Sequence, residues 1–254
     1  MHAWTKSGNP IEHPKPWGVY GAFSTLRITS ESKILFQKDH LERIYNTAQY
    51  LELPWVPEPD ELNSRIQTTL PQPSADHDHL LRICIFEDIL GLSYRPALSD
   101  GNPVEGWLLS YRRPDPSVKC TAEKDLYGTL HELEIEKEDW IIHDPKDNEL
   151  RETATSNLLF VRDGKLMIPE NKILQGITLQ KILPLLHENF SISRGIPKDQ
   201  EVSEFDEILL CGTGRGVAPL IGLPELGWSS GGDSIFSEIR SIYETLVGSD
   251  DAKI

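Results

Sequence analysis

Short segments of the chain carry residue types that could do chemistry. The run Gly212-Thr-Gly-Arg-Gly216 could cradle a phosphate with its backbone N–H groups, although it lacks the Lys-Ser/Thr pair of a P-loop. The run Asp76-His-Asp-His79 offers metal-ligand atoms, but its composition is that of a solvated loop. Cys120 could be a nucleophile, yet His131 would lie about three helical turns away. Taken alone, these segments predict no metal site and favour simple packing for Cys120.

A further candidate is an arginine on a predicted helix. Asp39 can cap a helix whose apolar side chains recur at helical spacing as far as Leu51. His40, Arg43 and Thr47 then share the opposite flank of this helix. A planar, permanently charged guanidinium can hold a phosphate with two parallel hydrogen bonds, so Arg43 is a candidate phosphate ligand.

Separate motifs match one known family in the right order. Phe23-Ser-Thr-Leu-Arg27 and His40-Leu-Glu-Arg-Ile44 are similar to its Phe-Glu-Thr-Leu-Arg strand and His-Leu-x-Arg-Leu helix. Glu152-Thr-Ala-Thr-Ser-Asn-Leu-Leu-Phe-Val-Arg-Asp-Gly-Lys-Leu166 is similar to its Glu-Gly-Ser-Thr-Ser-Asn-Ile-Phe-x-Val-x-Asp-Gly-x-Leu motif. Ile173-Leu-Gln-Gly-Ile-Thr178 and Leu210-Cys-Gly-Thr-Gly-Arg-Gly-Val-Ala-Pro219 complete the series. From about Gly18 to Trp228, the chain therefore resembles the class IV aminotransferases of pyridoxal-phosphate fold type IV.

The resemblance implies pyridoxal 5'-phosphate (PLP) as the cofactor and gives roles to several residues. Arg43 would hold the cofactor phosphate. Glu152 would lie against the pyridine nitrogen, where a carboxylate keeps that nitrogen protonated and strengthens the ring as an electron sink. Thr155 and Ser156 would support the ring through hydroxyl contacts, or would simply cap the turn.

The resemblance also identifies a catalytic lysine. In the family, this lysine precedes the glutamate by an offset that lands on Lys119 in this chain. Such a lysine forms a Schiff base with PLP and then shuttles a proton between substrate and cofactor carbons. The residues that follow, Cys120-Thr-Ala-Glu-Lys124, depart from the family pattern. Lys124 therefore stays open as a rival.

The last motifs imply contacts with the cofactor phosphate. Ile177 and Thr178 would begin a helix whose N–H groups bind the anion together with the threonine hydroxyl. Leu179 stands where the family commonly has arginine. Thr213 and Gly214 fall in the final motif, whose threonine also touches the phosphate.

Other residues are candidates for substrate binding. Arg27, Tyr94 and Arg95 could bind a substrate carboxylate, since the arginine fork matches that group, but each could equally belong to an ion pair or a dimer contact. Phe23 is assigned to the same substrate site. Arg215, in the glycine-rich turn, could meet a substrate carboxylate or face solvent.

The same apparatus serves several reactions in this family, and the fold does not choose among them. Transfer of an amino group between an amino acid or amine and a 2-oxo acid is the first hypothesis. The alternative is aminodeoxychorismate lyase activity, which eliminates pyruvate. Ser24 stands where most of the transaminases have glutamate, and Gly91-Leu-Ser-Tyr-Arg-Pro96 resembles the lyase segment Gly-x-Gly-Tyr-x-Pro. Glu87-Asp88 replace the Ser-Arg-Gly of the lyases, which argues against that activity.

Hypotheses outside catalysis also stay open. A degenerate PLP-fold protein could act as a binding or regulatory module, as the altered surroundings of Lys119 suggest. A plain α+β domain with accidental matches would not bring Lys119, Glu152, Arg43 and Thr178 around one pocket.

The elements that must position these residues are mixed in type. Periodicity predicts a hairpin over 19–36, helices over 39–51 and 60–69, and strands over 80–86 and 107–111. Further along, it predicts a helix over 122–133, strands over 140–143, 157–161, 165–168, 207–211 and 217–221, and helices over 177–186 and 235–246. Pro184 would kink the first of these last two helices or end it early.

The proline-rich run 112–117 predicts an interdomain connector. We therefore expect a small α+β domain over 1–111, a connector over 112–118 and a larger α/β domain over 119–254. The resemblance implies a two-domain arrangement like that of D-amino-acid aminotransferase, with the cofactor between the domains and close to a homodimer interface.

Composition restricts the class of partner. The 254 residues include 25 Lys and Arg against 40 Asp and Glu, which gives a formal charge of −15. This charge argues against binding to nucleic acid or to anionic membranes. The sequence has no long apolar run and no secretory signal at its N-terminus, so we expect a cytoplasmic protein. The cysteines, Cys84, Cys120 and Cys211, show no paired spacing and are expected to be free and packed.

Overall fold

The structure is a computed structural model that describes residues 1–12, 20–74, 76–249 and 252. The chain divides into two compact units, unit 1 with residues 1–98, 118–124 and 250–254, and unit 2 with residues 99–117 and 125–249. This division differs from the expected boundary at 112–118. The reason is that Val104–Ser110 pairs with strands of unit 2, while 118–124 returns to unit 1.

Unit 1 is built on an antiparallel sheet with the strand order β1-β5-β4-β2-β3. The strands are β1 (His2–Thr5), β2 (Ala22–Ile28), β3 (Ile34–Leu35), β4 (His79–Ile85) and β5 (Ile89–Pro96). The predicted hairpin is present as β2 and β3, and Val19 at its expected start lies outside the described residues. β1 and β5 were not predicted as strands.

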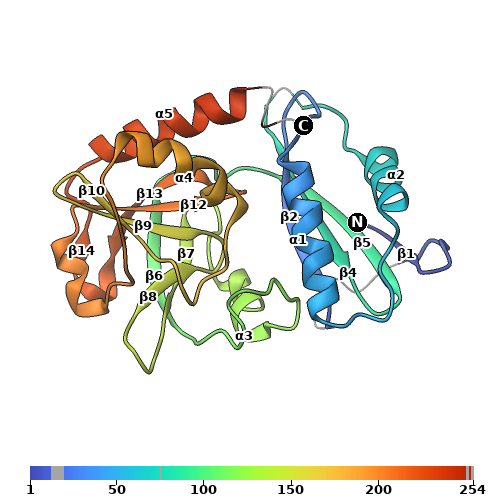
Figure 1. Cartoon of the computed structure of the whole chain (residues 1–254), viewed down its shortest axis with the longest axis horizontal. Coiled ribbons are helices and arrows are strands. Elements are labelled where there is room, and N and C mark those ends of the chain that lie inside the picture. The colour runs from blue at the N-terminus through green and yellow to red at the C-terminus, as the bar shows by residue number, and fades with distance from the viewer. Residues whose placement is uncertain (13–19, 75, 250–251, 253–254) are drawn as a thin grey trace. The chain divides into compact units, whose positions relative to one another are not determined.

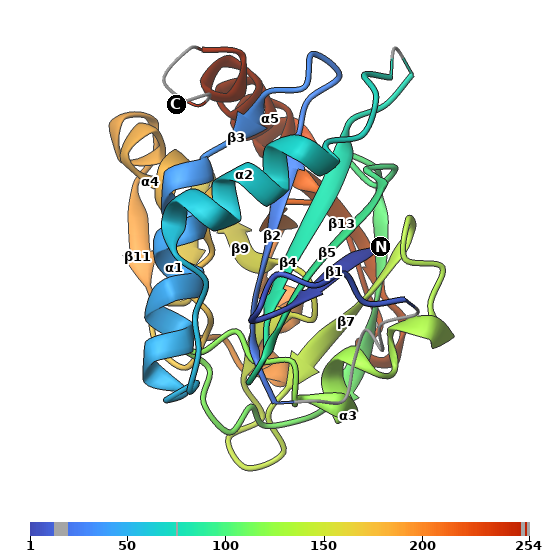
Figure 2. The same cartoon turned by 90° about the vertical axis from the view of Figure 1, so that its right-hand side faces the viewer.

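Helices α1 (Gln37–Tyr50) and α2 (Pro59–Thr69) cover one face of this sheet (Figure 2). Side chains that alternate along the strands point to this face and form the core of unit 1 with the helices. The core includes Leu26, Ile44, Ile66, Leu81 and Leu92.

The start of α1 differs from the expectation. The residue before the helix is Phe36, which has a positive φ of 50°, and Asp39 lies in the first turn instead of capping it. The cause is local, because β3 ends at Leu35 and leaves only Phe36 to turn the chain into the helix.

Unit 2 contains the larger sheet, with the strand order β11-β10-β9-β12-β13-β6-β7-β8 and with β14 beside β13 (Figure 1). An additional pairing of β8 with β9 closes the run from β9 to β8 into a barrel. The strands are β6 (Val104–Ser110), β7 (Glu138–His143), β8 (Leu150–Thr153), β9 (Asn157–Arg162), β10 (Lys165–Ile168), β11 (Ile192–Arg194), β12 (Glu207–Gly212), β13 (Gly216–Leu223) and β14 (Trp228–Ser229).

Successive side chains of β9 and β12 point to opposite faces of the sheet and pack in two different hydrophobic cores. Leu158 and Leu210 belong to the cluster formed with β6, β7 and β13, whereas Leu159 and Leu209 lie beneath the helices α4 (Ile177–Asn189) and α5 (Ser234–Gly248). These helices pack on each other and on β12 and β13 (Figure 1).

Pro184 does not end α4 early, because the helix continues to Asn189. Pro184 is exposed, so its missing N–H lies on the solvent side of the helix. The buried side chains Ile182 and Leu186 hold the helix against the sheet on either side of the proline.

The helix expected over 122–133 is wrong. Only a short helix, α3 (Lys124–Tyr127), and a 3₁₀ turn (Leu130–Glu132) form there. Gly128 lies between them and disfavours a continuous helix by about 1 kcal/mol relative to alanine. Further 3₁₀ turns lie at Asp199–Glu204 and Pro224–Leu226.

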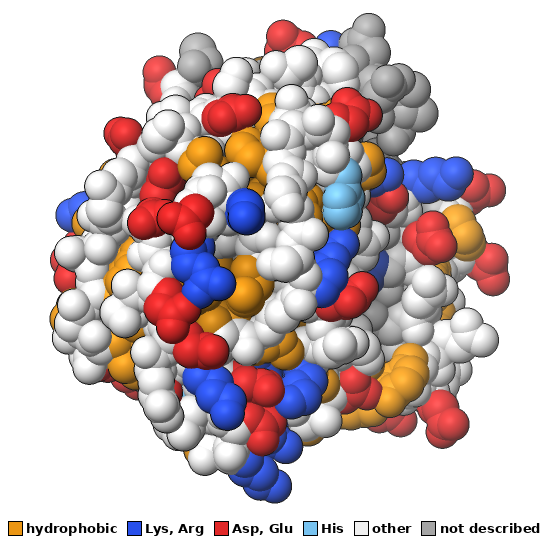
Figure 3. All heavy atoms as spheres, turned by 60° about the vertical axis from the view of Figure 1, so that its left-hand side comes forward, with side chains coloured by type: hydrophobic (Ala, Val, Ile, Leu, Met, Phe, Trp, Pro, Cys, Tyr) orange, Lys and Arg blue, Asp and Glu red, His pale blue; other side chains and the backbone are white. Residues whose placement is uncertain are grey.

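The surface carries charges of both signs, and the cysteine thiols are buried. Figure 3 shows acidic and basic side chains interspersed on one face, an arrangement that does not favour nucleic-acid binding there. Cys84, Cys120 and Cys211 are free and buried. Within the described ranges, every helix is too short or too polar to cross a bilayer.

Candidate active site

Backbone hydrogen bonds hold Lys119 beside the start of β2. Phe23 N–H donates to the carbonyl oxygen of Lys119 at 3.1 Å, and Thr121 N–H donates to that of Gly21 at 2.9 Å. The half-buried Lys119 places Nζ 4.8 Å from the centroid of the Phe23 ring, within the range of a cation–π contact. The rival Lys124 is exposed at the start of α3. Lys119 is thus the more buried of the two lysines.

Arg43 is tied to two buried polar side chains. Its Nη2 donates to Ser24 Oγ at 2.7 Å, and His40 Nδ1 lies 3.0 Å from Ser24 Oγ and 3.3 Å from Arg43 Nη2. Ser24 and His40 are buried, and Arg43 itself is half-buried. Arg43 is therefore not an ordinary exposed helix arginine.

His40 connects this group with Lys119. Burial lowers the pKa of His40 well below its ordinary value of 6.5, and the positive charges of Arg43 and Lys119 lower it further. Lys119 is hydrogen-bonded to Phe23, and Arg43 is hydrogen-bonded to Ser24, the next residue of β2, so unit 1 brings Lys119 and Arg43 to the same part of this strand.

The lowered pKa of His40 predicts an acid-sensitive stability. Below pH 6.5 the unfolded chain binds a proton at His40 that the folded chain excludes, so acid lowers the free energy of unfolding. Between pH 7.5 and pH 5.5 this one group should remove at most about 1.4 kcal/mol, the value reached when the folded chain binds no proton at His40. Urea unfolding at both pH values measures it, with His40→Asn as the reference variant that lacks the titrating group. Equal losses in the two proteins would contradict this assignment.

The other face of the unit 1 sheet carries the substrate candidates. Phe23 and Arg27 on β2 lie on the face opposite the core, and the strand register places Arg95 on that face too. Arg27 Nε donates to Asp78 Oδ2 at 2.6 Å. Tyr94 is not brought together with them, because it lies on the core face and its hydroxyl is 2.9 Å from Thr69 Oγ1.

Arg82 is a residue that sequence reasoning missed. It lies opposite Thr25 in the register, on the same face as Arg27 and Arg95, and its guanidinium is 5.5 Å from the Phe23 ring centroid. The alternation along β4, where Leu81 and Ile83 face the core, was the signal that could have found it.

In unit 2, Glu152 is a buried member of an ion pair. Its Oε1 accepts a hydrogen bond from Arg113 Nη1 at 2.9 Å, and the two side chains are only 6% and 3% exposed. The Leu174 N–H also donates to the carboxylate, at 3.2 Å to Oε1 and 3.1 Å to Oε2. Glu152 is therefore not the surface glutamate that a strand end commonly carries.

Asn157 joins the Glu152 turn to the start of α4. Its Nδ2 donates to the Leu174 carbonyl at 2.8 Å, and its Oδ1 accepts from Gly176 N–H at 3.1 Å. A Cβ at Gly176 would collide with this amide. No side chain caps the described N-terminus of α4, where buried Ile177 and Thr178 follow Gly176.

The turn between β12 and β13 lies close to the turn that follows Glu152. A Cβ at Gly212 would lie only 2.6 Å from Ser156 Oγ, so the strand that leads to Thr213 and Gly214 packs closely on the Thr155–Ser156 turn. Unit 2 thus gathers its candidates at neighbouring turns. They are Glu152, Thr155, Ser156, Ile177, Thr178, Thr213 and Gly214.

Arg215 is buried instead of facing solvent. Its Nε lies 3.2 Å from Asp139 Oδ2, and its Nη2 donates to the carbonyls of Ile135 and Glu138 at 3.0 and 2.6 Å. Burial raises the pKa of Asp139. The charge of Arg215 and hydrogen bonds from Thr155 and Thr153 act in the opposite direction. An arginine held in this way fixes the turn, and these contacts would have to break before it could bind a substrate carboxylate.

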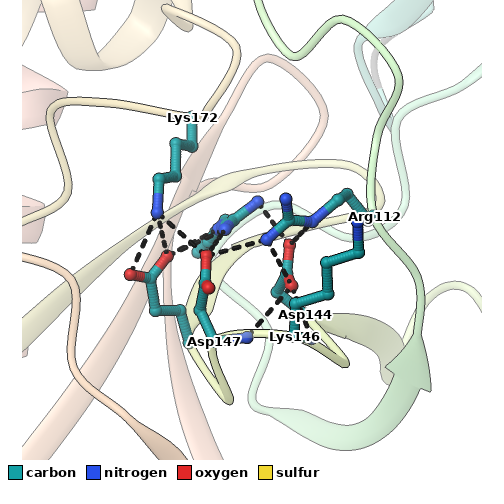
Figure 4. Close-up of polar contacts among 7 residues, drawn as sticks. Arg112, Asp144, Lys146, Asp147 and Lys172 are labelled. Carbon is teal, nitrogen blue, oxygen red and sulfur yellow. Dashed lines mark hydrogen bonds and ion pairs between the residues drawn. The ribbon is translucent and has the colours of Figure 1, made fainter.

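An ionic cluster lies next to the Arg113–Glu152 pair in the sequence (Figure 4). Arg112 contacts Asp144 at 2.7 Å and Asp147 at 2.8 Å, and Lys172 contacts Asp147 at 3.0 Å. Burial opposes ionisation of Asp144, but hydrogen bonds from Arg112 and backbone N–H groups, with the charge of Arg151, lower its pKa to about 2. The cluster links the segments that carry Arg113, Glu152 and Leu174.

The described parts of the chain contain no group of three or more His, Cys, Asp and Glu placed to hold a metal ion. His77 and His79 do lie close together, with ring centroids 4.9 Å apart.

Comparisons with known proteins show the family of the chain. Over residues 21–221, the sequence matches the family model for amino-transferase class IV. The search of curated proteins gave no match. Among solved structures, the chain is similar to the branched-chain aminotransferase of Thermoproteus uzoniensis crystallised with norvaline, with 18% identity, a TM-score of 0.79, and coverage of 98% of this chain and 95% of that one.

Further solved structures share the fold. An aminotransferase from Brucella abortus bound to PLP has 21% identity, a TM-score of 0.77, and coverage of 98% and 100%. A hypothetical aminotransferase from Mycobacterium tuberculosis bound to alpha-ketoglutarate and PMP has 17% identity, a TM-score of 0.72, and coverage of 98% and 100%. The expected fold class, that of the type IV aminotransferases, is confirmed. This protein is a member of the class IV aminotransferase family.

Proposed function

We propose that this protein is a PLP-dependent enzyme that transfers an amino group between an amino acid or amine and a 2-oxo acid. The observation that carries the proposal is the position of Lys119, whose backbone is bonded to β2 and whose amine lies on the Phe23 ring. An amine and a phosphate-binding arginine, Arg43, in one neighbourhood suit a cofactor that has an aldehyde and a phosphate.

PLP, when bound, supplies an electron sink for the bonds that break at the substrate carbon. Arg43 would bind the phosphate through its guanidinium. In unit 2, the N–H groups of Ile177 and Thr178 and the turn at Thr213 would offer donors to a phosphate. Glu152 would hold the proton on the pyridine nitrogen.

Lys119 has two tasks in this proposal. Its Nζ would hold the cofactor at the aldehyde carbon. The same nitrogen would also act as the acid–base group that moves a proton at the substrate carbon. A single amine can do both because it stays beside the reacting carbon. Lys124 is exposed on α3.

The substrate class is proposed from the arginines on the face of the unit 1 sheet that lies opposite the core. Arg95 would bind the carboxylate of the amino acid and of the 2-oxo acid, and Arg27, on the same face, would do so once its ion pair with Asp78 breaks. Similar structures that contain norvaline or alpha-ketoglutarate support this class of substrate.

One observation favours the lyase as the second candidate. Ser24, the small residue in place of the glutamate of most transaminases, is buried and bonded to Arg43. The elimination of pyruvate from aminodeoxychorismate would use the same lysine and cofactor.

The test is a substrate screen with the PLP-loaded protein. Amino acids and amines are offered with 2-oxoglutarate or pyruvate, and the new amino acid is measured. Aminodeoxychorismate alone, with release of pyruvate as the readout, tests the lyase. Amino transfer supports the proposal, pyruvate release selects the lyase, and PLP binding without either reaction indicates a binding module.

A further inference from the structure

We propose that Ser24 and His40 are positioning residues that orient the guanidinium of Arg43 toward a phosphate monoester. This inference rests on the proposed function, in which Arg43 binds the phosphate of PLP.

The three side chains contact one another. Arg43 Nη2 donates to Ser24 Oγ at 2.7 Å and lies 3.3 Å from His40 Nδ1, while Ser24 Oγ and His40 Nδ1 are 3.0 Å apart. Ser24 is 0% exposed and His40 is 1% exposed. Buried contacts of this kind restrict the rotamers of a long side chain such as that of Arg43.

The donors and acceptors in this set determine the state of His40. A guanidinium can only donate, so the His40 Nδ1 that faces Arg43 Nη2 has to accept. Since Ser24 Oγ receives a hydrogen from Arg43, its own hydrogen is directed to the same Nδ1. His40 is then neutral and carries its proton on Nε2. Burial and the neighbouring cations, which lower the pKa of His40, agree with this state.

These contacts leave the positive charge of Arg43 without a counter-charge from Ser24 or His40. Because Ser24 and His40 are both uncharged, they orient Arg43 without neutralising its charge. The serine therefore suits a site in which the arginine charge is directed to an anionic ligand.

The experiment compares PLP with pyridoxal, which lacks the phosphate. The ratio of the Kd for pyridoxal to the Kd for PLP, measured by absorbance titration, reports the phosphate contribution alone. Ser24→Ala should reduce this ratio about tenfold, the effect of losing one hydrogen bond to a charged group. The Kd for pyridoxal should stay unchanged.

Thr47→Ala is the matched control, since Thr47 is buried one turn further along α1 and has no part in these contacts. Its ratio should equal that of the wild type. If Ser24→Ala does not fold, Ser24→Cys keeps the volume with a weaker acceptor and should also reduce the ratio. A wild-type ratio in the Ser24 variant overturns the positioning role alone. A wild-type protein that binds both compounds equally overturns the phosphate role of Arg43 and this inference with it.

Discussion

Replacing Lys119 by alanine is expected to slow amino-group transfer by about 10⁴-fold, the upper range for the loss of a positioned acid–base group. The variant removes the amine that lies 4.8 Å from the Phe23 ring centroid and leaves the backbone bonds to β2 available. It should therefore fold and still bind PLP non-covalently. The measurement is the rate of a single half-reaction with an amino donor, followed by absorbance.

Lys124→Ala is the control for this prediction. Lys124 is exposed on α3, so its loss should leave the rate within a factor of about two of the wild type. If the Lys119 variant turned over normally and the Lys124 variant did not, the catalytic lysine would be the rival.

Replacing Arg113 by methionine should lower the free energy of unfolding by about 3–5 kcal/mol, because it leaves Glu152 as a buried charge without its ion-pair partner. That loss is large against a typical total stability of about 5–15 kcal/mol. A shift of the urea midpoint, followed by circular dichroism, measures it. The double variant Arg113→Met with Glu152→Gln should recover most of the loss, since the neutral amide removes the buried charge.

The adjacent Arg112→Met is the matched substitution. Arg112 is 38% exposed, and its partner Asp144 keeps a contact with Arg151 at 2.6 Å. Its midpoint should move much less than that of the Arg113 variant. Equal shifts in the two variants would mean that the Arg113–Glu152 pair has no special weight in stability.

The sequence predicted the elements whose signals are local. The β2–β3 hairpin, the body of α1 and the β12–β13 hairpin follow from apolar periodicity within one segment. The division into units could not be predicted in the same way. It depends on the parallel pairing of β6 with β13, a contact between residues far apart in the sequence. The proline-rich run 112–117 lies where the chain passes from unit 2 back to unit 1, so it does not separate an N-terminal domain from a C-terminal one.

In the candidate site too, the sequence predicted single residues but not the contacts between residues far apart in the chain. Motif matches pointed to Lys119, Arg43 and Glu152 as separate residues, and the structure places the first two near the buried His40. The partner of Glu152 gave no local signal, because Arg113 lies on the connector that was expected to be a plain linker. Arg82 had a signal in the strand alternation. The burial of Arg215 against Asp139 had none, since it depends on how distant turns meet.

The assignment of Lys119 is tested most directly by trapping the cofactor on the chain. The PLP-loaded wild-type protein is reduced with borohydride and digested, and the modified peptide is identified by mass spectrometry. We expect a phosphopyridoxyl group on Lys119, with none on Lys124. An adduct on Lys124 or another lysine would contradict the assignment of Lys119, and a folded protein that gives no adduct with excess PLP would contradict the proposed enzyme.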